Sequence, residues 1–200
     1  MSIEIDNADK VFFPDAGYTK GDLADYYQRI SAEMLRHIEN RPLTLHRFPD
    51  GIAGVNFIQK SVQDHYPDWI KRVTVDKEDG EITHALAGDA DTLAWLVDQG
   101  TIAFHVWLSR ADKPHHPDRL IFDLDPPGDD FDLVVKAARC VRERLDGLGL
   151  QAFVMTTGSS GLHVVVPLDR SADFDTVRDF AERVAEQLAD EHPDNFTTAH

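Results

Sequence analysis

The sequence predicts a mixed α/β protein whose second half is a split β-α-β unit. Three observations predict this fold. Apolar residues recur at helical spacing in the long segments and at strand spacing in the short ones, and Pro or Gly turns separate the segments. The second half also follows the order strand–helix–strand–strand–helix. With 200 residues, 42% of them hydrophobic, the chain suffices for one well-buried domain or at most two small ones.

The first half combines two helices with short strands. Thr19 and Asp22 form a capping pair that opens a helix running to about Asn40. We expect Asp91 to cap a second, shorter helix that ends at Val97. The expected strands are 43–47 and 55–59, joined by a turn at 49–51; 70–75 and 82–86, joined by a turn at 78–80; and 101–108.

The second half has clearer boundaries. The expected elements are a strand at 119–125 stopped by two prolines, a helix ending near the glycines at 147 and 149, strands at 152–157 and 162–168, and a helix to about 191. In the complete six-element fold the first strand has a neighbour on both sides, but this order leaves one edge of the 119–125 strand open. We therefore expect the sequence to be cut short, with the partner strand just beyond His200, or supplied by the first half or by another subunit.

Composition and charge narrow the class of protein. A net charge of −16 argues against a nonspecific nucleic-acid binder, although a local basic groove is compatible with it. No run of about eighteen apolar residues occurs, so the sequence predicts no membrane span. The acidic N-terminus lacks the pattern of a signal peptide, and the single cysteine, Cys140, excludes an internal disulfide. These features fit a reducing cytoplasm.

Asp123 and Asp125 form a carboxylate pair at strand spacing. Because side chains alternate along a strand, both carboxylates lie on one face while the apolar residues beside them face the core. Their Cα atoms are roughly 6.5–7 Å apart, so the two side chains can converge on one or two divalent cations. The alternative is a solvated strand end with two surface acids before a proline turn. The apolar strand and the nearby glycine turn favour the metal site.

A small-residue turn precedes a histidine-bearing strand. In Gly158-Ser159-Ser160-Gly161 the backbone N–H groups and hydroxyls can surround phosphate oxygens. His163 faces away from its apolar neighbours and can donate to a phosphate or sugar oxygen. The alternative is an ordinary hairpin turn with a half-buried histidine. No Walker motif occurs in the sequence.

The remaining histidines do not predict a zinc site. His115 and His116 lack further ligands at zinc spacing, and the lone cysteine supplies no thiolate set. We expect His105, within a Phe/Val/Trp strand, to be a core-edge residue or a substrate contact. Asp98 and Asp112 read as solvated surface charges.

Basic residues gather in the first half, several of them beside aromatic residues. This mixture is typical of surfaces that meet phosphates and bases, so the first half is the expected nucleic-acid face. Any one of these side chains alone reads more simply as a scattered surface charge. The set is Lys10, Lys20, Arg41, Arg47, Lys60, Lys71 and Arg72.

These residues together resemble the polymerase domain of bacterial DNA ligase D, a branch of the archaeo-eukaryotic primase superfamily. The resemblance covers essentially the whole chain. The segments that carry it are 9–14 (DKVFFP), 19–22 (TKGD), 40–44 (NRPLT), 49–51 (PDG), 57–60 (FIQK), the strand with His105, 117–126 (PDRLIFDLDP) and 158–167 (GSSGLHVVVP).

The resemblance implies a primase-like fold and an activity. Residues 1–200 would form a single primase-polymerase domain, with an RRM-like split β-α-β unit packed with an N-terminal α/β unit. Within it, 1–110 would bind DNA ends and 117–200 would bind metal and nucleotide. The implied activity is template-directed nucleotidyl transfer with Mn²⁺ or Mg²⁺ from an NTP or dNTP. It would act at gapped or broken DNA ends with a 5′-phosphate, in non-homologous end joining with Ku and a DNA ligase, in the nucleoid of a bacterial or archaeal cytoplasm.

The resemblance also implies roles for individual residues. Asp123 and Asp125 match two of three metal-binding, catalytic carboxylates. The matching nucleotide contacts are Ser159, Ser160, Gly161, His163 and His105; the matching 5′-phosphate contacts are Lys10, Lys20 and Arg47; and the matching template-stacking positions are Phe57 and Ile58.

Three departures from the family pattern stand out. The third aspartate of the family lies on a strand after the last helix, which this chain lacks, as it lacks downstream arginines that meet the triphosphate. Ser160 stands where the family usually has Lys or Arg, and Ile58 stands where many members have a second Phe. Two alternatives therefore remain beside the polymerase. The first is a noncatalytic module that binds DNA ends and 5′-phosphates, and the second is a metal-dependent phosphoesterase that uses Asp123, Asp125 and nearby histidines.

Overall fold

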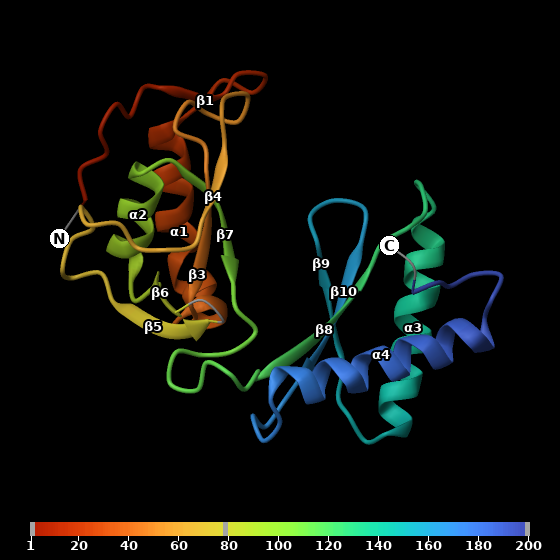
Figure 1. The fold of residues 1–200 in the computed structure, drawn as a ribbon. Coiled ribbons are helices and arrows are strands. Elements are labelled where there is room, and N and C mark those ends of the chain that lie inside the picture. The colour runs from red at the N-terminus through yellow and green to blue at the C-terminus, as the bar shows by residue number, and fades with distance from the viewer. Residues whose placement is uncertain (1–2, 78–79, 199–200) are drawn as a thin grey trace. The chain divides into compact units, whose positions relative to one another are not determined.

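The chain forms two compact units, Met1–Pro114 and His115–His200 (Figure 1). The computed structural model describes residues 3–77 and 80–198, so His200 and most of the turn expected at 78–80 lie outside the described residues. Both units mix helices with small antiparallel sheets, which confirms the predicted mixed α/β class. That the two units form one domain stays a prediction.

The first unit contains two helices and three small sheets within its described residues. A three-stranded antiparallel sheet has the order β4-β3-β7, and β1-β2 and β5-β6 are hairpins. The elements are β1 (Val11–Phe13), β2 (Tyr18–Thr19), α1 (Lys20–Ile38), β3 (Leu43–Arg47), β4 (Phe57–Gln59), β5 (Arg72–Lys77), β6 (Gly80–Ala85), α2 (Ala90–Asp98) and β7 (Thr101–Val106).

Side-chain caps begin both helices of this unit. The Thr19 hydroxyl accepts a hydrogen bond from the Asp22 backbone N–H, and the Asp22 carboxylate accepts one from the Thr19 N–H, which confirms the predicted capping pair. The prediction for α2 was wrong by two residues. Asp89 is its cap and accepts from Thr92 N–H, whereas Asp91 lies in the first turn. An acidic residue is favourable both at the cap and in the first turn of a helix, so the residue types alone do not show which aspartate is the cap.

One face of the β4-β3-β7 sheet is buried and the other is open. Leu43 and Leu45 of β3 pack into a core with Leu93 and Leu96 of α2. Because strand side chains alternate, Thr44 and His46 lie on the opposite face. Within the described part of this unit, both helices lie on the same side of the sheet (Figure 1).

The second unit has the predicted order strand–helix–strand–strand–helix. Its sheet has the antiparallel order β8-β10-β9, and the helices pack on one face around an apolar core that includes Phe122, Leu145, Val166 and Leu188 (Figure 1). Across the whole chain, five of the eight predicted strands are one or two residues shorter than predicted, the strand at 43–47 has the predicted bounds, and the strands predicted at 70–75 and 82–86 are displaced to 72–77 and 80–85. The elements are β8 (Arg119–Leu124), α3 (Phe131–Gly147), β9 (Phe153–Thr156), β10 (Leu162–Pro167) and α4 (Phe174–Glu191).

Strand β8 lies at one edge of this sheet. It pairs with β10 on one side, and among the described residues no strand pairs with its other side. No helix in the described part of the chain has the length and apolar character needed to cross a membrane.

Candidate functional site

The end of β8 presents the carboxylate pair. Phe122 is buried in the core, whereas Asp123, next along the strand, has a side chain 61% exposed. Asp125 follows one residue after the strand and is also exposed. Alternation along β8 therefore separates the core from the carboxylates as the sequence predicted.

His163 on β10 lies directly opposite Asp123 on β8. The His163 Nε2 atom is 3.1 Å from Oδ1 of Asp123, and the histidine side chain is 25% exposed. The other ring nitrogen, Nδ1, is buried and has no hydrogen-bond partner within the described part of the chain. An Nδ1–H would have no acceptor among the described residues, so the geometry assigns the hydrogen bond toward Asp123 to an Nε2–H donor.

The glycine turn between β9 and β10 is held by the Thr157 hydroxyl. That hydroxyl donates to the Gly161 carbonyl at 3.1 Å and accepts from the Ser159 N–H at 3.3 Å. Gly158 has a φ of +85°, a backbone conformation that favours glycine. Ser159 and Ser160 are exposed at the tip of the turn. The Ser159 hydroxyl lies 3.3 Å from the Thr157 hydroxyl, and both serines lie at the surface where a phosphate cradle would need them.

Gly161 connects this turn to the carboxylate pair. A Cβ at Gly161 would lie 2.5 Å from Oδ1 of Asp125 and 2.7 Å from the Leu124 carbonyl oxygen. Only glycine lets the turn approach the end of β8 so closely. The structure therefore brings Asp123, Asp125, Gly161 and His163 together, so the carboxylate pair and the small-residue turn adjoin, as the sequence suggested.

The donor set at the end of β8 fits a hard divalent cation. Mg²⁺ is commonly held by one or two carboxylates, with phosphate oxygens and waters completing the shell. Asp123 and Asp125 supply such carboxylates, and the small-residue turn beside them can take the phosphates. No group of three or more His, Cys, Asp or Glu side chains in the described ranges is arranged to hold a metal.

His105 lies in the first unit, on β7, whereas the other predicted nucleotide contacts lie in the second. It is exposed on the open face of the β4-β3-β7 sheet and lies opposite Thr44 of β3. Ile58 of β4 lies opposite His46 of β3 on the same face and is 50% exposed. His105, a predicted nucleotide contact, and Ile58, a predicted template contact, therefore lie on the same face of this sheet.

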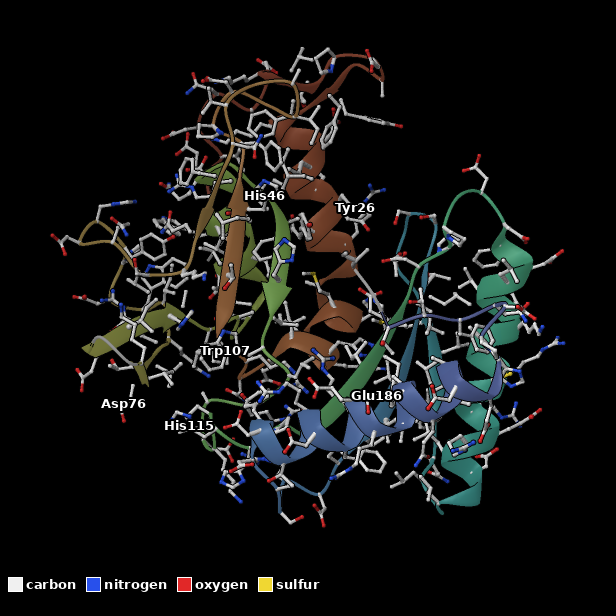
Figure 2. All side chains as sticks on the ribbon, turned by 45° about the vertical axis from the view of Figure 1, so that its right-hand side comes forward. Tyr26, His46, Asp76, Trp107, His115 and Glu186 are labelled. Carbon is white, nitrogen blue, oxygen red and sulfur yellow. The ribbon has the colours of Figure 1, made fainter. Side chains whose placement is uncertain are left out.

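His46, which was not among the residues predicted from the sequence, lies on the central strand of this sheet (Figure 2). Its Nε2 is 2.8 Å from Oδ1 of Asn56, its ring stands 4.3 Å from that of Phe48, and the His105 ring is 6.3 Å away. The alternation of Leu43–Arg47 was the available signal, because it places His46 on the face opposite Leu45. His46 is a further candidate contact on the open face.

Arg47 is held by neighbours in the first unit. Its Nε donates to the Gln99 carbonyl at 2.8 Å, its Nη1 donates to Oε1 of Gln59 at 2.6 Å, and its guanidinium carbon lies 5.4 Å from the centre of the Phe57 ring. Burial lowers the pKa of Arg47, and the nearby Tyr66 acts in the opposite direction. The Phe57 ring is therefore 44% exposed and contacts a guanidinium whose position is fixed by hydrogen bonds.

Lys20 is buried, and Asp98 is its partner. Their side chains are 8% and 11% exposed, and Lys20 Nζ lies 2.6 Å from Oδ1 of Asp98. Lys20 also donates to the Asp6 carbonyl, and Asp98 accepts from the Asp6 N–H at 2.8 Å. The expectation that Asp98 is a solvated surface charge was wrong. Its partner lies 78 residues away in the sequence, so no local pattern signals the pair.

Lys10 is exposed and pairs with Asp50. Its Nζ lies 2.7 Å from Oδ1 of Asp50 and donates to the Pro49 carbonyl at 2.8 Å. The Lys20 N–H donates to the Lys10 carbonyl at 2.8 Å, which ties β1 to the start of α1. The Gln99 amide donates to Asp98 at 3.3 Å. One network therefore links all three predicted 5′-phosphate contacts: Lys10, Lys20 and Arg47.

The chain matches one protein-family model along most of its length. The family is described as "LigD, primase-polymerase domain", and its model matches residues 19–200.

Three curated relatives carry related names. The multifunctional non-homologous end joining DNA repair protein LigD of Mycobacterium tuberculosis is 36% identical over 200 residues, covering 96% of this chain and 26% of the relative. The bifunctional LigD of Bacillus subtilis is 31% identical, covering 98% and 32%. The multifunctional LigD of Pseudomonas aeruginosa is 32% identical, covering 98% and 23%. The chain thus spans a third or less of each of these relatives.

A solved structure matches the fold. It is the polymerase domain from Mycobacterium tuberculosis ligase D in complex with DNA, with a TM-score of 0.89 and 36% identity. The match covers 96% of this chain and 70% of that one.

Proposed function

Because this chain belongs to the LigD primase-polymerase domain family, we propose that it is a metal-dependent nucleotidyltransferase acting at DNA gaps or broken ends. Its substrates would be an NTP or dNTP and a gapped duplex with a 5′-phosphate. Its partners in end joining would be Ku and a DNA ligase, within the cytoplasm. The names of the relatives and the DNA in the solved neighbour support this setting.

The observation that carries the proposal is the arrangement at the end of β8. Two exposed carboxylates adjoin a glycine turn, and His163 directs a nitrogen at one of them. A nucleotidyl transfer needs carboxylates that can hold a divalent cation beside a phosphate cradle, because the cation would neutralise the triphosphate and the cradle would position it. A phosphoesterase could use the same groups, but the family match favours the polymerase.

In the reaction, the primer 3′-hydroxyl attacks the α-phosphate of the nucleotide, forming a P–O bond while pyrophosphate leaves. Asp123 and Asp125 would hold Mn²⁺ or Mg²⁺. Such an ion, when bound, neutralises phosphate charge and lowers the pKa of the attacking hydroxyl. Ser159 and Ser160 donate hydroxyl hydrogen bonds to phosphate oxygens, and Thr157 fixes the turn that presents them. His163 Nε2–H donates to the nucleotide or keeps the Asp123 carboxylate oriented.

The first unit would bind the DNA. The open β4-β3-β7 face offers His105, His46 and Ile58 to the nucleotide and template, and Phe57 offers a ring for base stacking. The network around Lys10 and Arg47 would receive the 5′-phosphate. Lys20, which is buried against Asp98, would hold the backbone of Lys10 in place through the hydrogen bond from its N–H to the Lys10 carbonyl.

Primer extension tests the proposal. With Mn²⁺, nucleoside triphosphates and a 5′-phosphorylated gap, the chain should extend the primer, and Asp123→Asn should abolish extension. Asp190→Asn, which removes an exposed carboxylate on α4, is the matched control and should extend normally. Extension that survives Asp123→Asn would refute the role of the carboxylate pair.

A noncatalytic end-binding module is the second candidate. It would use the Lys10 and Arg47 network of the first unit to bind the 5′-phosphate, without catalysis at the carboxylate pair. It predicts tight binding to 5′-phosphorylated gaps with no extension under any metal condition. Primer extension and gap binding, measured on the same protein, distinguish the two candidates: a polymerase binds and extends, whereas an end-binding module only binds.

A further inference from the structure

The two lysines assigned to the 5′-phosphate differ in how firmly a carboxylate holds them. The Lys10–Asp50 pair is open to solvent, with side chains 41% and 71% exposed. The Lys20–Asp98 pair is almost closed off, at 8% and 11%. Asp98 also accepts hydrogen bonds from the Asp6 N–H and the Gln99 amide, so its position is fixed from several sides.

This difference in exposure determines which of the two lysine ammonium groups a phosphate can bind. An exposed ion pair contributes little net stability, because water screens it and both side chains lose freedom. A buried pair is costly to break, because an uncompensated charge is left behind. A phosphate can therefore replace the Asp50 carboxylate at Lys10, whereas Lys20 stays with Asp98.

We propose that Asp50 is a specificity-determining residue, which makes the Lys10 pocket select terminal phosphates over internal ones. The inference rests on the proposed 5′-phosphate pocket. Asp50 carries one negative charge, as does an internal phosphodiester, so a diester gains little by displacing it. A terminal phosphate monoester carries about −1.5 to −2 charges near pH 7 and competes better for the ammonium.

The backbone around Lys10 supports this exchange. Lys10 keeps its bond to the Pro49 carbonyl, so its ammonium stays in place when Asp50 leaves. The turn that carries Asp50 is anchored independently, since the Gly51 N–H donates to the Phe48 carbonyl and the Ile52 N–H to the Phe12 carbonyl. Asp50 can therefore swing away by side-chain rotation while the turn remains.

The test compares binding of three duplexes by fluorescence anisotropy: a gap with a 5′-phosphate, a gap with a 5′-hydroxyl, and an unbroken duplex. The wild type should prefer the 5′-phosphate. Asp50→Asn should bind all three more tightly and the unbroken duplex most of all, so the preference falls by about two- to fivefold. Lys10→Met should lose most of the preference. Asp15→Asn, an exposed carboxylate in the β1–β2 turn, controls for net charge and should keep the preference.

The outcomes separate the inference from the proposed function. A wild type that prefers the 5′-phosphate, with an undiminished preference in Asp50→Asn, would overturn this inference and leave the proposed pocket standing. An undiminished preference in Lys10→Met would overturn both, because Lys10 is part of that pocket. A wild type with no preference would overturn both. Circular dichroism melts of each variant show that the proteins compared are folded.

Discussion

His163 on β10 directs its Nε2 atom at Oδ1 of Asp123 on β8, across 3.1 Å and 40 residues of sequence. The contact joins the two motifs that the sequence presents separately. Gly161 makes a second junction, because its backbone lies against Asp125 with no room for a side chain. The carboxylate pair and the phosphate turn are therefore one structure.

Gly161→Ala should damage this junction without unfolding the protein. The new Cβ would overlap Asp125 Oδ1 and the Leu124 carbonyl, so Asp125 must shift away from its position. We expect affinity for Mn²⁺, measured by electron paramagnetic resonance titration, to fall about tenfold or more. Gly128→Ala is the matched control, because nothing lies within 4 Å of the added Cβ. Equal Mn²⁺ affinity in both variants would show that Gly161 does not position Asp125.

Lys20→Met should destabilise the first unit. It leaves the Asp98 carboxylate buried without its cation, which costs about 3 kcal/mol of the free energy of unfolding. Lys10→Met breaks an exposed pair and should cost less than about 1 kcal/mol. Urea denaturation measures both. The double variant Lys20→Met/Asp98→Asn should recover part of the loss, and similar losses in the two single variants would contradict the assignment of Lys20 as the buried, supporting lysine.

Two capping carboxylates make stability fall in acid. Hydrogen bonds from the Thr19 backbone and hydroxyl lower the pKa of Asp22, and those from the Thr176 side chain and backbone lower the pKa of Asp173. A lowered folded-state pKa means that the unfolded chain binds the proton more readily. The stabilisation is therefore present above the ordinary pKa of 3.8 and is lost as the pH falls through the folded-state value.

This loss is measurable by urea denaturation between pH 2.5 and 6. Asp22→Asn and Asp173→Asn should each flatten the acid side of the stability profile, because the amide does not titrate. An exposed acid such as Asp190, for which no cap is formed, is the control. Profiles that keep the wild-type slope in both capping variants would show that these caps do not set the acid limit.

The order of elements could be predicted from the sequence because it depends on local patterns. Helical spacing, the Thr19–Asp22 cap and the Gly and Pro turns all act within a few residues. The hairpin of β1 and β2 was missed, since strands of three and two residues carry too little alternation to detect. Asp89 was passed over for Asp91 because both acids suit a helix start.

The candidate site was predictable only in part, for the same reason. Asp123, Asp125 and His163 could be named as candidates because strand alternation separates them from the core. The pairing of Lys20 with Asp98 and the approach of Gly161 to Asp125 depend on how distant segments pack. Such contacts are set by the tertiary structure, and the composition of either segment gives no sign of them.

The most direct test of the carboxylate pair is a change of metal preference in primer extension. Asp123→Cys replaces a hard oxygen ligand with a soft thiolate. If Asp123 holds the catalytic ion, extension with Mg²⁺ should fall by about 100-fold or more and return in part with Cd²⁺, a softer ion. Asp190→Cys should keep the metal preference of the wild type. An Asp123→Cys variant that extends primers with the wild-type preference for Mg²⁺ would contradict the account.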